Sequence, residues 1–230
     1  MIPKILHQTT FEATWEERHL MKRAKAMMPD FEHKFWTDEA NLALFEKVFP
    51  QYVDDYRNFK QGVIRVDISR CLYLHEYGGT YCDTDYRFYR PLDAEFLANR
   101  CVLGIEEKND TFLGNLPKYG NAFMSSEKGF PLWAEFIESA FQRVRKGEER
   151  VLFIAGPHAL TLFLHERKDL HDQVTFLPPE TIYPDFRCMK LTTERNASTI
   201  GAHLCWGSWR NKAFVQRIKS QGRRRLSAIM

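Results

Sequence analysis

The chain has 230 residues, a formal net charge of +3, 44% hydrophobic residues and 27% charged residues. This composition excludes a largely disordered chain, and the length is sufficient to bury a sizeable core. The net charge is too small to indicate nucleic acid as a partner by itself. The five cysteines are odd in number and include no CxxC pair, which argues against a disulfide framework or a zinc knuckle and favours a reducing compartment.

The two ends of the chain differ in character. Residues 1–8 lack the apolar segment of a signal peptide, and no later segment is apolar for long enough to span a bilayer. We therefore expect a cytoplasmic protein. Residues 211–230 form a basic C-terminal tail, which is a candidate for peripheral contact with the anionic inner face of a membrane. The alternative interpretation of the tail is a solvated, frayed terminus.

Hydrophobic periodicity predicts the following elements in chain order. They are a strand at 4–7, a helix at 16–28 that Pro29 ends, a strand at 31–36, helices at 38–49 and 61–77, strands at 80–82 and 100–105, a loop at 114–129, a helix at 132–144, a strand at 152–155 and a helix at 158–165. The loop is rich in Gly, Asn, Pro and Ser, so we expect it to lie away from the core. The alternation indicates an α/β fold with a largely parallel sheet.

The strongest local signal is a pair of aspartates at the end of the predicted strand 80–82. Asp83 and Asp85 are two residues apart on an extended segment, so both carboxylates project to the same side. Four hard oxygens near one point suit Mn²⁺ or Mg²⁺, and ligands of open α/β sheets bind beyond the carboxyl ends of the strands. The alternative is a polar turn with two solvated aspartates, because this spacing alone is common.

The preceding helix adds a second pair of charged residues. Asp67 and Arg70 are three positions apart and therefore lie on one face of the helix. On their own they are also consistent with a surface ion pair that contributes little to stability. The opposite face, which we expect to pack on the sheet, carries Ile64, Ile68, Cys71, Leu72 and His75.

The block from Arg65 to Asp85 resembles the DXD sugar-binding region of glycosyltransferase family 32. Three other segments resemble the same family in the same order: Ile2 to Thr9, Phe35 to Asp38, and His203 to Trp209. That family includes the yeast initiating α-1,6-mannosyltransferase and bacterial capsule and lipopolysaccharide enzymes, and it is related to the clostridial glucosylating toxins.

The resemblance implies a GT-A type fold, in which a Rossmann-like, mostly parallel sheet is flanked by helices. It implies a single domain over 1–230, with a nucleotide-sugar-binding part at about 1–105, an acceptor-side part at about 106–210 and the basic tail at 211–230.

Roles for individual residues follow from their positions in the family's motifs. Asp85 and His203 would ligate the metal directly, and Asp83 would reach it through water while touching the ribose or sugar. Gln8 and Thr9 would line the pocket for the base and ribose, and Asp67 and Arg70 would bind donor-sugar hydroxyls. Ser208 and Trp209 would close over the diphosphate. The resemblance thus implies a catalytic set of Asp67, Arg70, Asp83 and Asp85.

Some residues of these motifs are also consistent with purely structural roles. Taken singly, His203 resembles a satisfied core histidine, and we expect Trp206 to be a packing residue. The family often has Trp where this chain has Thr10, so Phe11, another aromatic residue or no residue at all would stack on the base. Two segments, Ala155 to Thr161 and Asn121 to Met124, resemble weaker family motifs near the substrates.

The sequence therefore predicts a metal-dependent, retaining hexosyltransferase. Its donor would be a nucleotide-diphosphate sugar, with UDP favoured, and its acceptor a glycan or lipid-linked saccharide in polysaccharide or lipopolysaccharide synthesis. One alternative is a phosphohydrolase with Asp83 as nucleophile and Asp85 as acid, although Arg87 stands where such enzymes usually have Thr. Another is a basic-tailed module that binds membrane or nucleic acid without catalysis.

Overall fold

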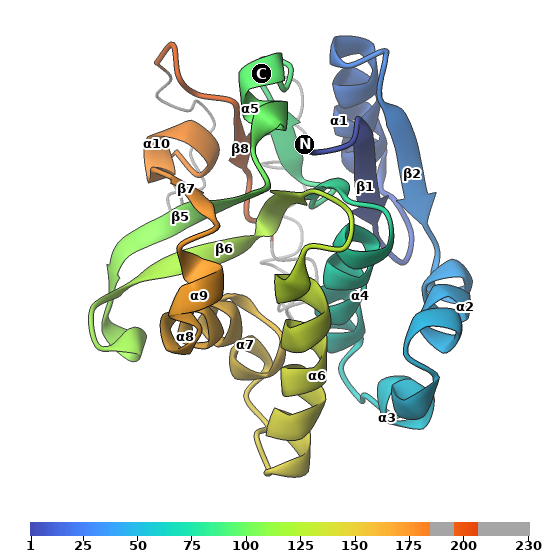
Figure 1. The fold of residues 1–230 in the computed structure, drawn as a ribbon. Helices are drawn as coiled ribbons and strands as arrows, with labels where there is room; N and C mark the ends of the chain where they lie inside the picture. The colour runs from blue at the N-terminus through green and yellow to red at the C-terminus, as the bar shows by residue number, and fades with distance from the viewer. Residues whose placement is uncertain (185–195, 207–230) are drawn as a thin grey trace, which may run out of the picture.

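The computed structural model describes residues 1–184 and 196–206, which form a mixed α/β fold (Figure 1). Its main sheet has six strands in the order β2-β1-β3-β6-β5-β7. Their bounds are β1 Ile5–Thr9, β2 Glu32–Trp36, β3 Gly79–Cys82, β5 Cys101–Asp110, β6 Leu116–Ser126 and β7 Thr175–Leu177. β1 pairs in parallel with β2 and β3, and β5 pairs in parallel with β7. β6 runs antiparallel to both of its neighbours, β3 and β5, so the other five strands all point the same way. The sheet is therefore mostly parallel, as predicted.

The helices connect these strands and include all five of those predicted. Their bounds are α1 Trp15–Met27, α2 Asp38–Val48, α3 Val53–Arg57, α4 Gly62–Glu76, α5 Ala94–Ala98, α6 Pro131–Arg145, α7 Val151–Ile154, α8 Pro157–Glu166, α9 Lys168–His171 and α10 Pro179–Ile182, with 3₁₀ turns at Pro50–Tyr52 and Thr111–Leu113. None of the helices in the described residues is both long and apolar enough to cross a lipid bilayer.

Alternate residues of the sheet face two separate cores, which gives three layers. On β5, Cys101 and Leu103 belong to a core that includes residues of α4, α6 and α8, whereas Val102 between them belongs to a core that includes residues of α1, α5 and α10. This two-residue alternation is the period of a strand. Figure 1 shows α4, α6 and α8 on one side of the sheet, together with α7 and α9.

The end of α4 aims the chain into β3. Gly78 and Gly79 have φ of +67° and +97°, a backbone conformation that other residues rarely adopt. A Cβ on Gly78 would also lie 2.5 Å from the backbone nitrogen of Lys128. These glycines therefore end the helix, as predicted, and turn the chain directly into the strand that leads to Asp83.

Two of the predicted elements are wrong. The segment 114–129, predicted as a loop, contains β6, a strand buried between β3 and β5. Its small residues meet a packing need, because a Cβ on Gly120 would lie 2.5 Å from the Tyr183 ring. The segment 152–155, predicted as a strand, lies mostly within the short helix α7. A short apolar run fits either structure, and here it joins α6 to α8.

A second, two-stranded sheet joins distant parts of the chain. β4 (Tyr86–Phe88) pairs antiparallel with β8 (Gly201–His203), and Tyr86 stands opposite His203. A Cβ on Gly201 would lie 2.4 Å from the Tyr86 ring, so this pairing requires glycine there. The small sheet brings the late segment beside the aspartates that follow β3.

Candidate active site

The turn that carries the two aspartates is held at several points. Asp83 follows the last residue of β3, and its backbone N–H donates to the carbonyl of Ala122 on β6 at 2.9 Å. The hydroxyl of Thr84 donates to Glu17 Oε1 of α1 at 2.8 Å. Asp85 then stands directly before β4. The turn is therefore fixed by contacts with the sheet on one side and with α1 on the other.

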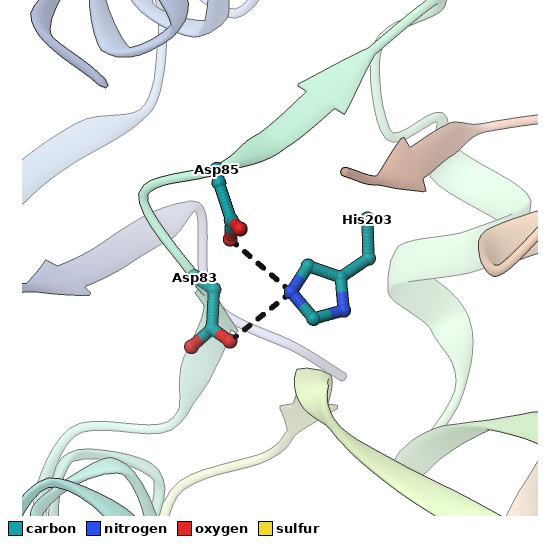
Figure 2. Close-up of side chains that lie close together, drawn as sticks. All are labelled: Asp83, Asp85 and His203. Atoms are coloured by element: carbon teal, nitrogen blue, oxygen red, sulfur yellow. Dashed lines mark ion pairs between the residues drawn. The ribbon is translucent and has the colours of Figure 1, made fainter. Parts of the chain in front are cut away.

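His203 lies beside both aspartates, as Figure 2 shows. Its Nε2 is 3.1 Å from Asp85 Oδ1 and 3.5 Å from Asp83 Oδ2. Each of the three side chains offers one ligand atom, and these atoms all lie within 4.8 Å of one another. Residues more than a hundred positions apart in the sequence thus converge on one point.

The environment keeps Asp85 ionised. Burial raises the pKa of Asp85. The neighbouring His203 and the backbone N–H groups that donate hydrogen bonds to the Asp85 carboxylate lower that pKa by more, so the net shift is downward. One of these is the backbone N–H of Trp206, 2.8 Å from Asp85 Oδ2. Burial likewise lowers the pKa of His203, but Asp85 and Cys205 raise it well above its usual value. The two side chains therefore form an ion pair when no other cation lies between them.

The chemistry of these side chains fits a divalent cation. Two carboxylates and one imidazole form a ligand set that Mn²⁺ accepts, and carboxylates also suit Mg²⁺. His203 would ligate through a neutral nitrogen, so a bound cation would replace the proton that His203 shares with Asp85 in the ion pair. Asp83, Asp85 and His203 are the described residues that would hold the metal.

A second buried cluster adjoins the first. Arg70 Nη2 lies 3.1 Å from Asp67 Oδ1, and Arg70 Nη1 donates to the backbone oxygen of Asn121 at 2.6 Å. The amide of Asn121 donates to the same Asp67 oxygen at 3.0 Å. Asp67 and Arg70 are about 95% buried, so they do not form the exposed surface pair that the helical spacing also allowed. Burial, opposed by the charge of Arg70, raises the pKa of Asp67 to about 7.

Asp83 connects the two clusters. Its Oδ1 lies 3.4 Å from Arg70 Nη2 and accepts a hydrogen bond from the hydroxyl of Tyr81 at 2.6 Å. The guanidinium of Arg70 also lies over the Tyr81 ring, 4.8 Å from its centroid. One oxygen of Asp83 thus faces Arg70 and Tyr81, while the other faces His203. The arrangement can bind a cation on one side and sugar hydroxyls on the other.

The other predicted site residues differ in whether they lie beside this cluster. The side-chain amide of Gln8 donates to the backbone oxygen of Asp83 at 3.4 Å, next to the cluster. The hydroxyl of Thr9 instead donates to the Trp36 carbonyl at 2.9 Å, within a buried polar network. Phe11 is 89% exposed, so its ring is free to contact a ligand. Ser208 and Trp209 lie outside the described residues.

Several residues near the site were not predicted from the sequence. Tyr81 and Thr84 belong to the DXD block itself, yet nothing in the local pattern identifies their hydrogen-bond partners. Glu17 is recognisable in the sequence as part of a capping box with Thr14, but not as the partner of Thr84. Trp206 packs with Leu20 and Leu204, as predicted, while its backbone also binds Asp85.

Residues 15–103 match a family model described as glycosyltransferase sugar-binding region containing DXD motif. This segment, which is less than half of the chain, is thus similar to the sugar-binding region of glycosyltransferases that contain a DXD motif. The matched segment contains Asp67, Arg70, Asp83 and Asp85 but neither β1 nor β8. The placement of His203 beside the DXD aspartates therefore comes from the structure and not from this match.

Fungal proteins are among the named relatives of this chain. Mannosyl phosphorylinositol ceramide synthase SUR1 of Saccharomyces cerevisiae is 32% identical over 126 residues, which are 52% of this chain and 32% of that protein. Inositol phosphoceramide mannosyltransferase 3 of Schizosaccharomyces pombe is 34% identical over 94 residues, which are 40% of this chain and 26% of that protein. The chain thus matches about a third or less of the length of these relatives.

Two solved structures resemble this chain in fold. The PaToxG glycosyltransferase aligns with a TM-score of 0.55 at 18% identity, over 74% of this chain and 73% of that one. The ligand-free glycosyltransferase domain from the YGT toxin aligns with a TM-score of 0.56 at 8% identity, over 76% of this chain and 80% of that one. These likenesses confirm the predicted GT-A type fold.

Proposed function

We propose that the protein transfers a hexose from a nucleotide-diphosphate donor to a hydroxyl group of a glycan or lipid-linked acceptor, and that it needs a divalent cation. The observation that carries the proposal is the convergence of Asp83, Asp85 and His203 beside the buried pair of Asp67 and Arg70. A sugar nucleotide offers a charged diphosphate and sugar hydroxyl groups. Side chains that can bind a cation and side chains that can bind hydroxyl groups meet here at the carboxyl end of a parallel strand, where open α/β sheets bind their ligands.

The two clusters divide the work of binding the donor. Mn²⁺ or Mg²⁺ bound at Asp85, His203 and Asp83 would neutralise the negative charge of the diphosphate. Asp67 and Arg70 supply an acceptor and a donor of hydrogen bonds on the neighbouring side, where they would orient the hexose. Asn121 holds both of these side chains through its amide and its backbone oxygen. The sugar would therefore meet groups that are already fixed before it binds.

We further propose that the transfer retains the anomeric configuration. In that reaction the acceptor attacks the face from which the nucleoside diphosphate departs, and the departing phosphate oxygen takes the proton of the acceptor hydroxyl. No side chain need then act as a general base. An NMR time course of the first-formed product anomer tests this proposal, and an inverted anomer would contradict it.

The names of the relatives narrow the choice of substrates to test first. One is named an inositol phosphoceramide mannosyltransferase, and the other is named a mannosyl phosphorylinositol ceramide synthase. We therefore propose a mannosyl donor as the first candidate, beside the UDP-sugars that the family resemblance favoured. An acceptor with a polyol or saccharide headgroup on a lipid is the matching class.

The experiment is a panel of sugar nucleotides incubated with the protein, with and without Mn²⁺. Cleavage of one donor class that requires the cation, together with thermal stabilisation by cation and nucleotide added jointly, supports the proposal. Hydrolysis of simple phosphate esters without any preference for sugar nucleotides would instead support a phosphohydrolase. Binding of RNA without any affinity for sugar nucleotides would support a binding module.

A further inference from the structure

The exposed face of α1 carries positive charge with no acidic residue among it. Arg18, Lys22 and Lys25 recur at intervals of four and three residues, so they form one stripe along the helix, and the neighbouring Arg23 is also exposed. The two acidic residues of the helix, Glu16 and Glu17, are buried. We call Arg18, Lys22, Arg23 and Lys25 the basic face of α1.

Two aromatic side chains extend this face toward its N-terminal end. Trp15, the first residue of α1, is 53% exposed, and Phe11, four positions before it, is 89% exposed. Trp15 also stacks with His19, at 5.5 Å between ring centroids. Glu12, between the two aromatic residues, is the exposed acidic residue of this segment. Large exposed aromatic rings beside a basic stripe are the combination that interfacial helices use.

The opposite side of α1 packs against the candidate active site. Glu17 accepts a hydrogen bond from Thr84, which lies between the two DXD aspartates. Leu20 packs with Leu204 and Trp206, the residues that follow His203. The first turns of α1 therefore stand at the edge of the site, and Figure 1 shows this helix beside β1 and β2.

We propose that the basic face of α1, with Phe11 and Trp15, docks on a lipid bilayer that contains anionic lipids. Positive charge alone would also attract nucleic acid, but exposed Phe and Trp at one end of the stripe favour the headgroup region of a membrane, where aromatic side chains concentrate. Docking in this orientation would leave α1, about 10 Å across, between the site and the headgroups. The proposal does not depend on the transfer reaction, because binding to vesicles can be measured without a donor.

The test is co-sedimentation of the full chain with phosphatidylcholine vesicles, with and without phosphatidylserine, at low and high salt. We expect binding that requires phosphatidylserine and weakens at high salt, because exposed charges are screened. A Lys22→Glu/Lys25→Glu variant should bind at least roughly tenfold more weakly, since each basic residue near such a surface strengthens binding about fivefold. A Lys60→Glu/Lys146→Glu variant makes the same change of charge at exposed positions elsewhere and should bind like the wild type.

A second measurement tests the aromatic part of the face. Vesicles with brominated acyl chains should quench the fluorescence of the wild type more than that of a Trp15→Phe variant. The Lys22→Glu/Lys25→Glu variant should keep the melting temperature of the wild type, because both side chains are exposed. The proposal is overturned if the two double variants bind alike, if phosphatidylserine makes no difference, or if RNA binds and vesicles do not.

Discussion

His203 Nε2 lies 3.1 Å from Asp85 Oδ1, although 117 intervening residues separate the two positions along the chain. The antiparallel pairing of β4 with β8 produces this contact, since Asp85 directly precedes Tyr86 and Tyr86 stands opposite His203. A small two-stranded sheet therefore completes the DXD site with a third potential ligand.

Replacing Asp85 with Ala should reduce turnover by several orders of magnitude at saturating Mn²⁺. The change removes a carboxylate from the cation site and leaves the backbone N–H of Trp206 without its acceptor. The lost hydrogen bond should lower the free energy of unfolding by about 1–3 kcal/mol. Donor hydrolysis and thermal melting measure the two effects separately.

Asp93→Ala is the matched control for this variant. Asp93 also accepts a backbone N–H bond, from Phe96 at 2.9 Å, but it caps α5 on the surface. Its loss should cost about 1 kcal/mol of stability and leave turnover unchanged. Equal activity of the Asp85 and Asp93 variants would count against the role of Asp85.

Arg70→Lys should reduce kcat/KM for the sugar nucleotide by on the order of a hundredfold while changing the Kd of the nucleoside diphosphate little. The guanidinium reaches Asp67, Asp83 and the Asn121 carbonyl together, and an ammonium group cannot match that geometry. Steady-state kinetics and calorimetric titration with the diphosphate separate sugar binding from phosphate binding.

The control for Arg70 is Arg65→Lys on the same helix. Arg65 donates to the Phe59 carbonyl at 2.7 Å and contacts none of the site residues named above. Its replacement should leave kcat/KM within about twofold of the wild type. A similar loss of kcat/KM in both variants would mean that Arg70 acts by supporting α4 and not by binding the sugar.

The segment around the DXD motif was predictable because its signals are local. The apolar face of α4, the two glycines that end it and the paired aspartates follow one another without a break in the sequence. Each signal depends on neighbouring residues, so the helix, the turn and β3 were predicted close to their observed bounds. The buried environment of Asp67 and Arg70 was not predicted, because their partner Asn121 lies on the distant strand β6.

The elements that the sequence did not predict depend on contacts between distant segments of the chain. β6 is rich in small and polar residues, and its burial is explained by Tyr183 against Gly120 and by strands on both sides. β4 and β8 have three residues each, too few for a periodic pattern. The role of His203 was inferred from a family motif, because nothing in the local sequence indicates that it lies near Asp85.

Gly120→Ala tests the close packing of β6, the strand that the sequence analysis predicted as a loop. The added methyl group would lie 2.5 Å from the Tyr183 side chain and 2.6 Å from Glu106 Cγ, both in the interior. We expect the free energy of unfolding to fall by about 1–3 kcal/mol. Chemical denaturation of the variant beside the wild type measures the change.

For the control variant Gly62→Ala we expect no loss of stability. Gly62 begins α4, and the nearest atom to an added Cβ is a flexible Arg65 nitrogen at 3.6 Å. Because Ala favours the helix over Gly by up to about 1 kcal/mol, this variant should be as stable as the wild type or slightly more so. An undisturbed Gly120 variant would contradict the packing described for β6, and a destabilised Gly62 variant would contradict the open surroundings described for Gly62.

Stability should fall in acid because of His7. Its Nε2 is 2.9 Å from the Gly78 carbonyl and its Nδ1 accepts from the Trp36 indole at 3.1 Å, so the neutral ring satisfies both contacts. Burial lowers the pKa of His7 from 6.5 to about 4. Between these two pH values the unfolded chain binds the proton more readily than the folded chain does, so stability decreases as the pH falls, by about 3 kcal/mol in total.

Urea denaturation across this pH window measures the effect of His7. A His7→Gln variant should be less stable at neutral pH but should lose less additional stability on acidification than the wild type does. If the two proteins show the same dependence on pH, other groups are responsible for the acid sensitivity.

The most direct test of the proposed function is an anomalous diffraction map from crystals soaked with Mn²⁺ and a nucleoside diphosphate. The account predicts a manganese peak among the carboxylates of Asp83 and Asp85 and the imidazole of His203, in contact with the diphosphate. A map with bound nucleotide, no manganese peak at this position and the contact between His203 and Asp85 still closed would contradict it.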